Sequence, residues 1–397
     1  MQIGVSTAQS PLVSEPPLVS PALRIPLLAP SPPRLSTLGW ALEEIEHSGH
    51  FSNFGPVNTR FEAEIITKMF RGTGSCVTVA NATLGLMLAV KQATGWRPHG
   101  KYALMPSFTF TATAQAALWC GLTPLFCDID RDTWLPDAAS EEALLRQYGD
   151  DIAVIMPNAT YGNCLDVDRY DRLSRDTGVP LVIDAAAGLG SVQMNGDAFG
   201  RGSTAPMVFS MHATKCFATG EGGLIYCNDP ARIAALRRMA GFGLDTARVT
   251  VMPGINAKLS EVSALQALEK LREIGPIAKR RFALQRLYAR LLPGFTFQSM
   301  TGRQSGLQFA SLLLPSHLAP QRANILDALA RLGIGGGHYF SPHLAEHPFF
   351  RETCISGRLE VTQEVSERMV SLPLSDSLTE SQVRQICASF IRICRDA

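Results

Sequence analysis

The sequence has no apolar run of 18 residues, no CxxC pair and almost no excess of either charge. Without a long apolar run a transmembrane helix is not expected, and the N-terminus lacks the basic and apolar segments of a signal peptide. The net charge of +1 gives no reason to expect nucleic acid or a membrane as a partner. The nine cysteines are odd in number and irregularly spaced, which indicates reduced thiols rather than disulfides or a zinc site. We therefore expect a cytoplasmic protein without metal.

The composition indicates a packed protein with an unusual N-terminus. The 397 residues are 46% hydrophobic and 18% charged, enough for a large domain and a smaller one. Residues 1–33 carry eight prolines and almost no charge, so residues 1–35 are predicted to form an extended tail. An arm that docks on a partner subunit is the alternative. We predict a large domain over 36–255 and a small C-terminal domain over 256–397.

Short apolar runs alternate with helical patterns in the predicted large domain. Such alternation predicts an α/β three-layer domain with a mainly parallel sheet covered on both faces. The seven predicted strands are Cys76–Ala80, Tyr102–Met105, Pro124–Asp128, Ala153–Met156, Leu181–Asp184, Met207–Ser210 and Gly223–Cys227. The predicted helices between them include Thr83–Ala93, Thr113–Cys120, Ser140–Tyr148 and Asp168–Thr177.

The remainder of the chain is predicted to form a smaller α/β domain. Ser260 can cap a helix with an apolar stripe, and an amphipathic helix is expected near residues 380–393. The stripe consists of Leu265, Leu268, Leu271 and Ile274.

Polar and small residues follow several predicted strands, at the edge where open α/β sheets bind ligands. Ala82 and Thr83 open a helix after the first strand, and a helix N-terminus offers N–H groups to a phosphate. Ser210 is a second candidate phosphate donor. Alternatively, Asn81 is a plain helix cap with no ligand nearby.

Two charged residues also follow apolar runs, which is costly for a charge without a partner. Asp184 stands among alanines and requires a cationic partner, such as a pyridinium nitrogen, unless it caps a helix. Lys215 follows the run 207–209, where apolar surroundings favour the neutral amine that attacks aldehydes. A lysine at the edge of a loop is the alternative. Phe110 could stack on a cofactor ring or belong to the core.

Together these residues form the set that a pyridoxal phosphate (PLP) enzyme requires. Lys215 would form a Schiff base with the cofactor, and Asp184 would keep the pyridine nitrogen protonated. The lysine amine, once released, would act as the general acid and base.

These residues resemble the DegT/DnrJ/StrS-type aminotransferases, fold-type I PLP enzymes that aminate keto sugars. The resemblance runs from about residue 24 to residue 377, in nine blocks. They are Phe51–Pro56 with Phe61 and Glu62, Asn81–Thr83, Pro106–Thr113, Gly121–Asp130, Tyr161–Asn163 with Asp166, Ile183–Ala186, Phe209–Lys215, Gly220–Gly223 and Gly254–Asn256.

The resemblance implies roles for individual residues. Lys215 is similar to the family's cofactor lysine, and Asp184 to its pyridine partner. Phe110 matches the stacking aromatic, while the backbone N–H groups of Ala82 and Thr83, with Ser210, match the phosphate site. Asn256 matches an asparagine that reaches the phosphate of the neighbouring subunit's cofactor, which implies a homodimer with shared active sites. Candidate substrate contacts are His212, Lys258, His338 and Tyr339.

The implied activity is transfer of an amino group from glutamate to a nucleotide-linked deoxy sugar, with closest resemblance to enzymes acting on position 4 of 6-deoxy-4-keto sugars. Three departures leave alternatives open. Ala187 replaces a hydrogen-bonding residue, Ala257-Lys258 replaces Tyr-Arg, and residues 157–160 lack the histidine of many relatives. A keto cyclitol or another ring substrate is one alternative, and a PLP-binding regulatory protein is another. A sugar dehydratase is disfavoured, because such relatives replace the lysine by histidine.

Overall fold

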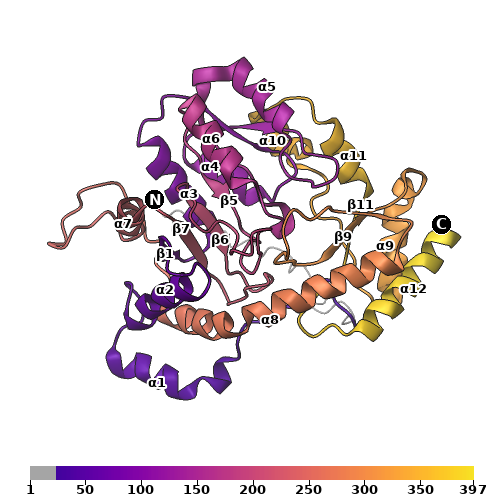
Figure 1. Cartoon of the computed structure of the whole chain (residues 1–397), viewed down its shortest axis with the longest axis horizontal. Helices are drawn as coiled ribbons and strands as arrows, with labels where there is room; N and C mark the ends of the chain where they lie inside the picture. Colours follow the sequence, from indigo (N-terminus) through magenta and orange to yellow (C-terminus); the bar gives the residue numbers. More distant parts are fainter. Residues whose placement is uncertain (1–23) are drawn as a thin grey trace, which may run out of the picture.

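The computed structural model describes residues 24–397, and we keep to that part of the chain. Its α-helices are α1 (Gly39–Ser48), α2 (Pro56–Lys68), α3 (Ala82–Thr94), α4 (Thr111–Trp119), α5 (Ala138–Tyr148), α6 (Val167–Thr177), α7 (Pro230–Ala240), α8 (Glu261–Leu291), α9 (Arg322–Arg331), α10 (Pro348–Thr353), α11 (Glu360–Arg368) and α12 (Glu380–Asp396). Its strands are β1 (Ser75–Val79), β2 (Tyr102–Pro106), β3 (Thr123–Cys127), β4 (Ile152–Ile155), β5 (Ile183–Asp184), β6 (Met207–Ser210), β7 (Gly223–Cys227), β8 (Thr296–Phe297), β9 (Ala310–Leu313), β10 (Ile355–Ser356) and β11 (Met369–Leu372). Figure 1 shows the central strands between layers of helices. The predicted α/β class is confirmed.

The central strands form two ladders rather than the single predicted seven-stranded sheet. One ladder has the order β1-β7-β6-β5 and the other β10-β3-β2-β4. Strands at all seven predicted positions are present, but β5 is short, and only isolated parallel bridges join Leu181 to Ile155 and Asp184 to Asn158. Between these bridges Pro157 has no N–H to donate to the Val182 carbonyl, although its own carbonyl accepts the Asp184 N–H at 2.9 Å, and this missing donor accounts for the interrupted ladder. The strand β10 was not predicted, and it extends the second ladder beside β3.

Both faces of the strands are buried, as expected for parallel pairs. Along β2 the side chains of Ala103 and Met105 enter one apolar cluster, whereas Leu104 enters the other. In β6 Val208 packs in the same cluster as Ala103, and its neighbours pack on the opposite face. The period of two therefore sends alternate residues into two cores, one on each side of the strands. Among the described strands of the two central ladders, β7 alone runs antiparallel to its neighbours, which are β1 and β6.

Side-chain caps fix where several helices begin. In each case the N-cap oxygen accepts the backbone N–H three residues further on, which satisfies an otherwise unpaired donor. The caps are Asn81 of α3, Asp137 of α5, Asp166 of α6, Asp229 of α7, Ser260 of α8 and Thr379 of α12. The predicted cap at Ser260 and the predicted C-terminal helix are thus confirmed.

The long helix α8 joins the two parts of the molecule. It has 31 residues, runs along the lower side of Figure 1, and buries the predicted apolar stripe 265–274. Near its middle Lys270 and Arg281, both almost fully buried, form ion pairs with Asp376. The C-terminal part adds the antiparallel sheet β11-β9-β8. The domain boundary at residue 256 remains a prediction, since β10 joins a ladder of the large part.

The predicted N-terminal tail, residues 1–35, lies largely outside the described residues, which begin at residue 24. At the start of the described chain, Ile25 is buried and pairs with the segment after α9. Its N–H donates to the Gly333 carbonyl at 3.0 Å, and its carbonyl accepts from the Gly335 N–H at 2.7 Å.

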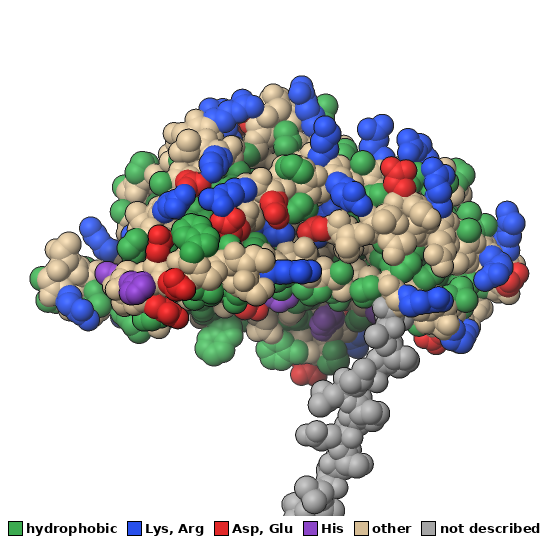
Figure 2. Space-filling view, turned by 90° about the horizontal axis from the view of Figure 1, so that it is seen from below, with side chains coloured by type: hydrophobic (Ala, Val, Ile, Leu, Met, Phe, Trp, Pro, Cys, Tyr) green, Lys and Arg blue, Asp and Glu red, His purple; other side chains and the backbone are tan. Residues whose placement is uncertain are grey.

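No helix within residues 24–397 combines the length and hydropathy needed to cross a bilayer. On the face seen in Figure 2, lysine and arginine side chains are spread among acidic and apolar ones rather than gathered in one patch.

Candidate active site

A cavity of about 690 Å³ lies at the carboxyl ends of β1, β5 and β6. It brings together most of the residues that the sequence predicts for the site. These are Ala82, Thr83, Phe110, Asp184, Ser210, His212, Lys215 and Tyr339. The remaining candidates, Asn256, Lys258 and His338, do not line this cavity.

The N-terminus of α3 forms one wall of the cavity. Asn81 caps the helix, because its side chain accepts the Leu84 N–H at 2.9 Å and its carbonyl accepts the Gly85 N–H. Neither the Ala82 nor the Thr83 N–H has a hydrogen-bond acceptor within residues 24–397. The cap and the ligand interpretation of Asn81 are therefore compatible: the cap orders the first turn and leaves two N–H groups for an anion.

The Asp184 carboxylate lies at the end of β5 and is 2% exposed. The Thr113 hydroxyl donates to it at 2.5 Å, and the Ala186 N–H donates at 3.0 Å. Burial raises the pKa of Asp184 above its ordinary value, while these hydrogen bonds and the charge of Lys215 act in the opposite direction. A cation against this carboxylate would stabilise its charged form.

Lys215 follows β6 and reaches into the same cavity, where burial disfavours its charged ammonium form. Burial lowers the pKa of Lys215, and the negative charge of Asp184 acts to raise it. The lowered pKa favours a neutral amine, the form that attacks carbonyl carbons. Its Nζ donates a hydrogen bond to Oε1 of Gln308 at 3.1 Å.

Aromatic side chains form the outer wall of the cavity. Phe110 precedes α4 and is 55% exposed, so it is not a core residue. Tyr339 stacks on Phe309 with ring centroids 5.1 Å apart, and Tyr161 stacks on Phe340 at 5.2 Å. A second cavity of about 440 Å³ shares Phe110, Tyr339 and Phe340 with the first. The two cavities are thus neighbours across one aromatic wall.

Three predicted contacts lie elsewhere. His338 lines only the adjoining cavity, where its Nδ1 lies 2.8 Å from the Ser341 carbonyl. Asn256 is exposed and accepts a hydrogen bond from Lys258 at 2.6 Å. The ammonium of Lys258 also lies over the Phe242 ring, 4.7 Å from its centroid. On this chain, then, Asn256 and Lys258 form a surface group apart from the cavity.

The sequence reasoning missed Gln308, Asn158 and Thr113. Gln308 and Asn158 line the cavity, and the Thr113 hydroxyl donates a hydrogen bond to the Asp184 carboxylate. Asn158 also forms the bridge that brings β5 beside the end of β4. Thr113 ends the block Pro106–Thr113 and Asn158 lies within residues 157–160, and the place of both segments after predicted strands is the signal that could have identified them. Nothing near Gln308 in the sequence indicates a site.

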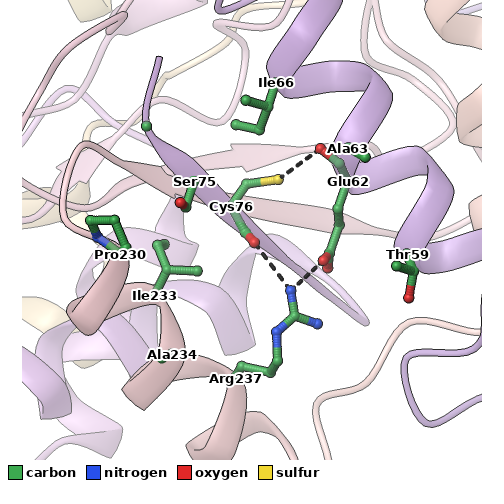
Figure 3. A pocket seen from close by; sticks show the side chains of 11 residues that line it. Thr59, Glu62, Ala63, Ile66, Ser75, Cys76, Pro230, Ile233, Ala234 and Arg237 are labelled. Atoms are coloured by element: carbon green, nitrogen blue, oxygen red, sulfur yellow. Dashed lines mark hydrogen bonds and ion pairs between the residues drawn. The ribbon is translucent and has the colours of Figure 1, made fainter. Parts of the chain in front are cut away.

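A further cavity of about 400 Å³ lies between α2, β1 and α7 (Figure 3). In Figure 3 the side chains of Glu62 and Arg237 point toward one another across it, and the two form an ion pair. Glu62 also accepts the Thr78 N–H at 2.8 Å and its hydroxyl at 3.0 Å. Because the carboxylate is already fully engaged, this group joins α2 to β1 and α7 rather than offering a reactive site.

Comparisons with known proteins agree with this geometry. The DegT/DnrJ/EryC1/StrS aminotransferase family matches residues 38–391. Protein Rv3402c of Mycobacterium tuberculosis is 35% identical, covering 92% of this chain and 89% of that protein. The dTDP-4-amino-4,6-dideoxy-D-glucose transaminase of Escherichia coli is 27% identical, covering 91% and 96%. The crystal structure of a putative PLP-dependent aminotransferase from Bacillus cereus ATCC 10987 superposes with a TM-score of 0.87 at 36% identity, covering 92% and 99%. The chain therefore belongs to the DegT/DnrJ/EryC1/StrS aminotransferase family, as a fold-type I transaminase that uses pyridoxal phosphate.

Proposed function

We propose that the enzyme transfers an amino group from glutamate to a keto group of a nucleotide-linked deoxy sugar, of the dTDP or GDP type. The observation that carries the proposal is the meeting of Lys215, Asp184 and the α3 N-terminus in one cavity. The name of the Escherichia coli relative, a dTDP-sugar transaminase, supports the substrate class.

The chemistry of the cavity fits pyridoxal phosphate. Lys215 would hold the cofactor covalently, and the buried Asp184 carboxylate would face the ring nitrogen, whose positive charge matches it. The free N–H groups of Ala82 and Thr83, with the Ser210 hydroxyl, would bind the phosphate. Phe110 would lie against the ring. When bound, the cofactor supplies an electron sink through which an amino group moves between substrates.

The protein's own groups would then do three things. Lys215, once its amine is free, would take up and return the proton at the reacting carbon. Asp184 would remain ionised beside the cation it faces, and the aromatic wall would exclude water from the inner cavity. His212 and Tyr339, which line the cavity, would contact the substrate, with His338 in the adjoining cavity.

The adjoining cavities offer room for an extended substrate, but they offer few cations. Lys215 is the one lysine or arginine among the described residues that line either cavity. We propose that a second copy of the chain supplies the missing charge, with Lys258 binding substrate phosphates and Asn256 reaching the partner's cofactor. The enzyme would then be a homodimer with two shared sites.

The proposed location of the enzyme is the cytoplasm, supported by nine cysteines that are all free.

A second candidate substrate is a keto cyclitol or another ring without a nucleotide. The specific observation in its favour is the same shortage of cations, combined with walls formed by aromatic rings. A ring substrate would need no phosphate site and would stack on these side chains.

The first test is the visible spectrum of the purified protein with PLP, before and after addition of glutamate. The proposal predicts a yellow absorption band that stays with the protein after unbound PLP is removed and that bleaches with glutamate, and it predicts that borohydride fixes PLP to the wild-type chain but not to Lys215→Ala. A band that survives glutamate would contradict glutamate as donor, and unchanged turnover in Lys215→Ala would contradict the mechanism.

The second test separates the substrate classes. The aminated enzyme is mixed with a dTDP-linked or GDP-linked 4-keto-6-deoxy sugar, or with a keto cyclitol, and recovery of the yellow band is timed. Rapid recovery with a nucleotide sugar alone supports the first proposal, and rapid recovery with the cyclitol alone supports the second.

A further inference from the structure

Gln308 connects the cavity lysine to the C-terminal part of the molecule. It stands two residues before β9, and its side chain reaches the loop after β6. Its Oε1 accepts the hydrogen bond from Lys215 Nζ at 3.1 Å, and its Nε2 donates to Thr214 Oγ1 at 2.9 Å. One amide thus contacts two adjacent residues of the lysine loop, through its acceptor and its donor.

The hydrogen bonds beyond Gln308 have a single consistent direction. Thr214 Oγ1 accepts from the amide, so its own hydrogen is free to donate to His212 Nδ1, 2.9 Å away. The Thr214 backbone N–H points at the same Nδ1 at 3.3 Å, which makes this nitrogen an acceptor. The imidazole proton therefore lies on Nε2, 3.6 Å from the Glu221 carboxylate. Each group holds the next in the orientation that leaves Gln308 Oε1 facing the lysine.

We propose that Gln308 is a positioning residue that holds the Lys215 amine over the reacting centre whenever that amine is not bonded to the cofactor. Thr214 and His212 fix the orientation of its amide. The inference rests on the proposed role of Lys215 and adds a residue that this role requires. The chain of hydrogen bonds is not a proton path, because an amide N–H is far too weak an acid to pass a proton on.

The requirement follows from the shape of the lysine side chain. A released lysine has four flexible methylene groups and can turn away from the carbon whose proton it must move. Proton transfer needs the amine within hydrogen-bond reach of that carbon's proton. Among the described residues, Gln308 Oε1 is the acceptor that Nζ contacts, so the amide sets where the free amine rests.

The test uses variants that distinguish loss of the hydrogen bond to Lys215 from loss of the folded structure. Gln308→Met keeps a similar volume and removes both hydrogen bonds, whereas Gln308→Glu keeps an acceptor for Lys215. Thr214→Val removes only the hydroxyl that orients the amide. Gln304→Met is the matched control, because Gln304 stands on the same segment but donates to the Gly190 carbonyl at 2.8 Å, outside the cavity.

The first measurement is made on the cofactor-free protein and needs no activity. An amine-reactive reagent labels Lys215 over a range of pH, and the labelled peptide is quantified by mass spectrometry. An acceptor stabilises the ammonium, so the midpoint should fall by about half a unit in Gln308→Met and rise in Gln308→Glu. The other titratable groups around the cavity are Asp184 on β5, His212 and Glu221 on the loop, and Tyr161 and Tyr339 opposite. All are unchanged in these variants, so a difference in midpoint reports on Gln308.

The second measurement is the rate of the half-reaction with glutamate at saturation. Gln308→Met should slow it by about 10- to 50-fold with little change in the glutamate concentration at half-saturation, because the hydrogen bond acts on the free amine rather than on binding. Thr214→Val should slow it by a smaller factor, and Gln304→Met should match the wild type.

The proposal is overturned if Gln308→Met shows the wild-type labelling midpoint, or if it reacts with glutamate at the wild-type rate. If Gln308→Met does not fold, the upward shift in Gln308→Glu and the slower rate in Thr214→Val decide the question. A wild-type spectrum that does not respond to glutamate would contradict the proposed donor, while the labelling shift would still test Gln308.

Discussion

Asp184 carries a charge where burial disfavours one, and its two hydrogen-bond donors compensate only in part. Asp184→Asn keeps the shape of the side chain and removes the charge. We expect the protein to fold and to bind PLP, but the half-reaction with glutamate should slow by about 10²- to 10³-fold, because under the proposed role of Asp184 the ring nitrogen would lose its partner. Stopped-flow absorbance measures this rate.

The control for this variant is Thr113→Val, which removes the 2.5 Å hydrogen bond and leaves the carboxylate in place. We expect about a tenfold loss there, the lower end of what one hydrogen bond to a charged group contributes. Equal losses in both variants would show that packing, not charge, is what the reaction needs from Asp184.

The raised pKa of Glu141 on α5 predicts that the free energy of unfolding depends on pH, independently of catalysis. Its side chain is 1% exposed, with Arg169 at 2.6 Å and the Tyr170 hydroxyl at 2.9 Å. Burial raises the pKa of Glu141 from 4.5 to about 6, although Arg169 and Tyr170 act to lower it. The folded state therefore binds this proton more tightly than the unfolded state does.

The sign of this effect follows from the raised pKa. The stabilising contribution is complete below pH 4.5, is lost as the pH rises through 6, and amounts to about 2 kcal/mol. Urea unfolding of the wild type and of Glu141→Gln at pH 4.5 and pH 7.5 measures it. The change in unfolding free energy between the two pH values should differ between the proteins by about that amount. Parallel pH profiles would contradict the raised pKa.

At the level of single residues, the residues predicted at strand ends line one cavity, whereas Asn256, Lys258 and His338 do not line it. Lys215, Asp184 and Ser210 each follow an apolar strand, and parallel strands bring their carboxyl ends to one edge. Gln308 could not be predicted in this way, because its place depends on how β9 packs against the loop after β6. The exposed Asn256 lies outside the cavity of its own chain.

At the level of elements, the start of α3 depends on a glycine in β7. A Cβ on Gly223 would lie 2.8 Å from the Ala82 nitrogen and 2.9 Å from the Asn81 carbonyl carbon. Backbone atoms cannot yield at that distance without moving the first turn of the helix. If α3 binds the phosphate as proposed, Gly223→Ala should weaken PLP binding by about tenfold or more, because the displaced N–H groups would no longer converge on it.

Titration of the cofactor-free protein with PLP, followed by absorbance, gives the dissociation constant. Gly220→Ala is the matched control, because a Cβ there meets only the Gln266 side chain, at 3.8 Å. Wild-type affinity in Gly223→Ala would show that α3 does not bind the phosphate.

Some elements have a sequence pattern of their own and can be predicted from it, whereas others do not. The helix α8 could be predicted because its cap and apolar stripe extend over many turns. The two-residue strand β10 has no pattern of its own, and its pairing with β3 is set by tertiary packing. Likewise the split between β4 and β5 arises from the missing N–H of Pro157, just after β4.

At the level of the whole molecule, the proposed shared site predicts that two inactive chains restore activity to one another. Lys215→Ala and Asn256→Ala should each be strongly impaired as pure dimers. In a mixed dimer, one site would carry both substitutions and the other would have Lys215 from one chain and Asn256 from its partner, both intact. Random mixing makes half of the dimers mixed, so about a quarter of the wild-type activity should return.

If Asn256 instead served its own chain, every site in the mixture would carry one substitution and no activity would return. Measuring turnover before and after the two variants are unfolded and refolded together therefore decides whether the enzyme has one chain or two at each site.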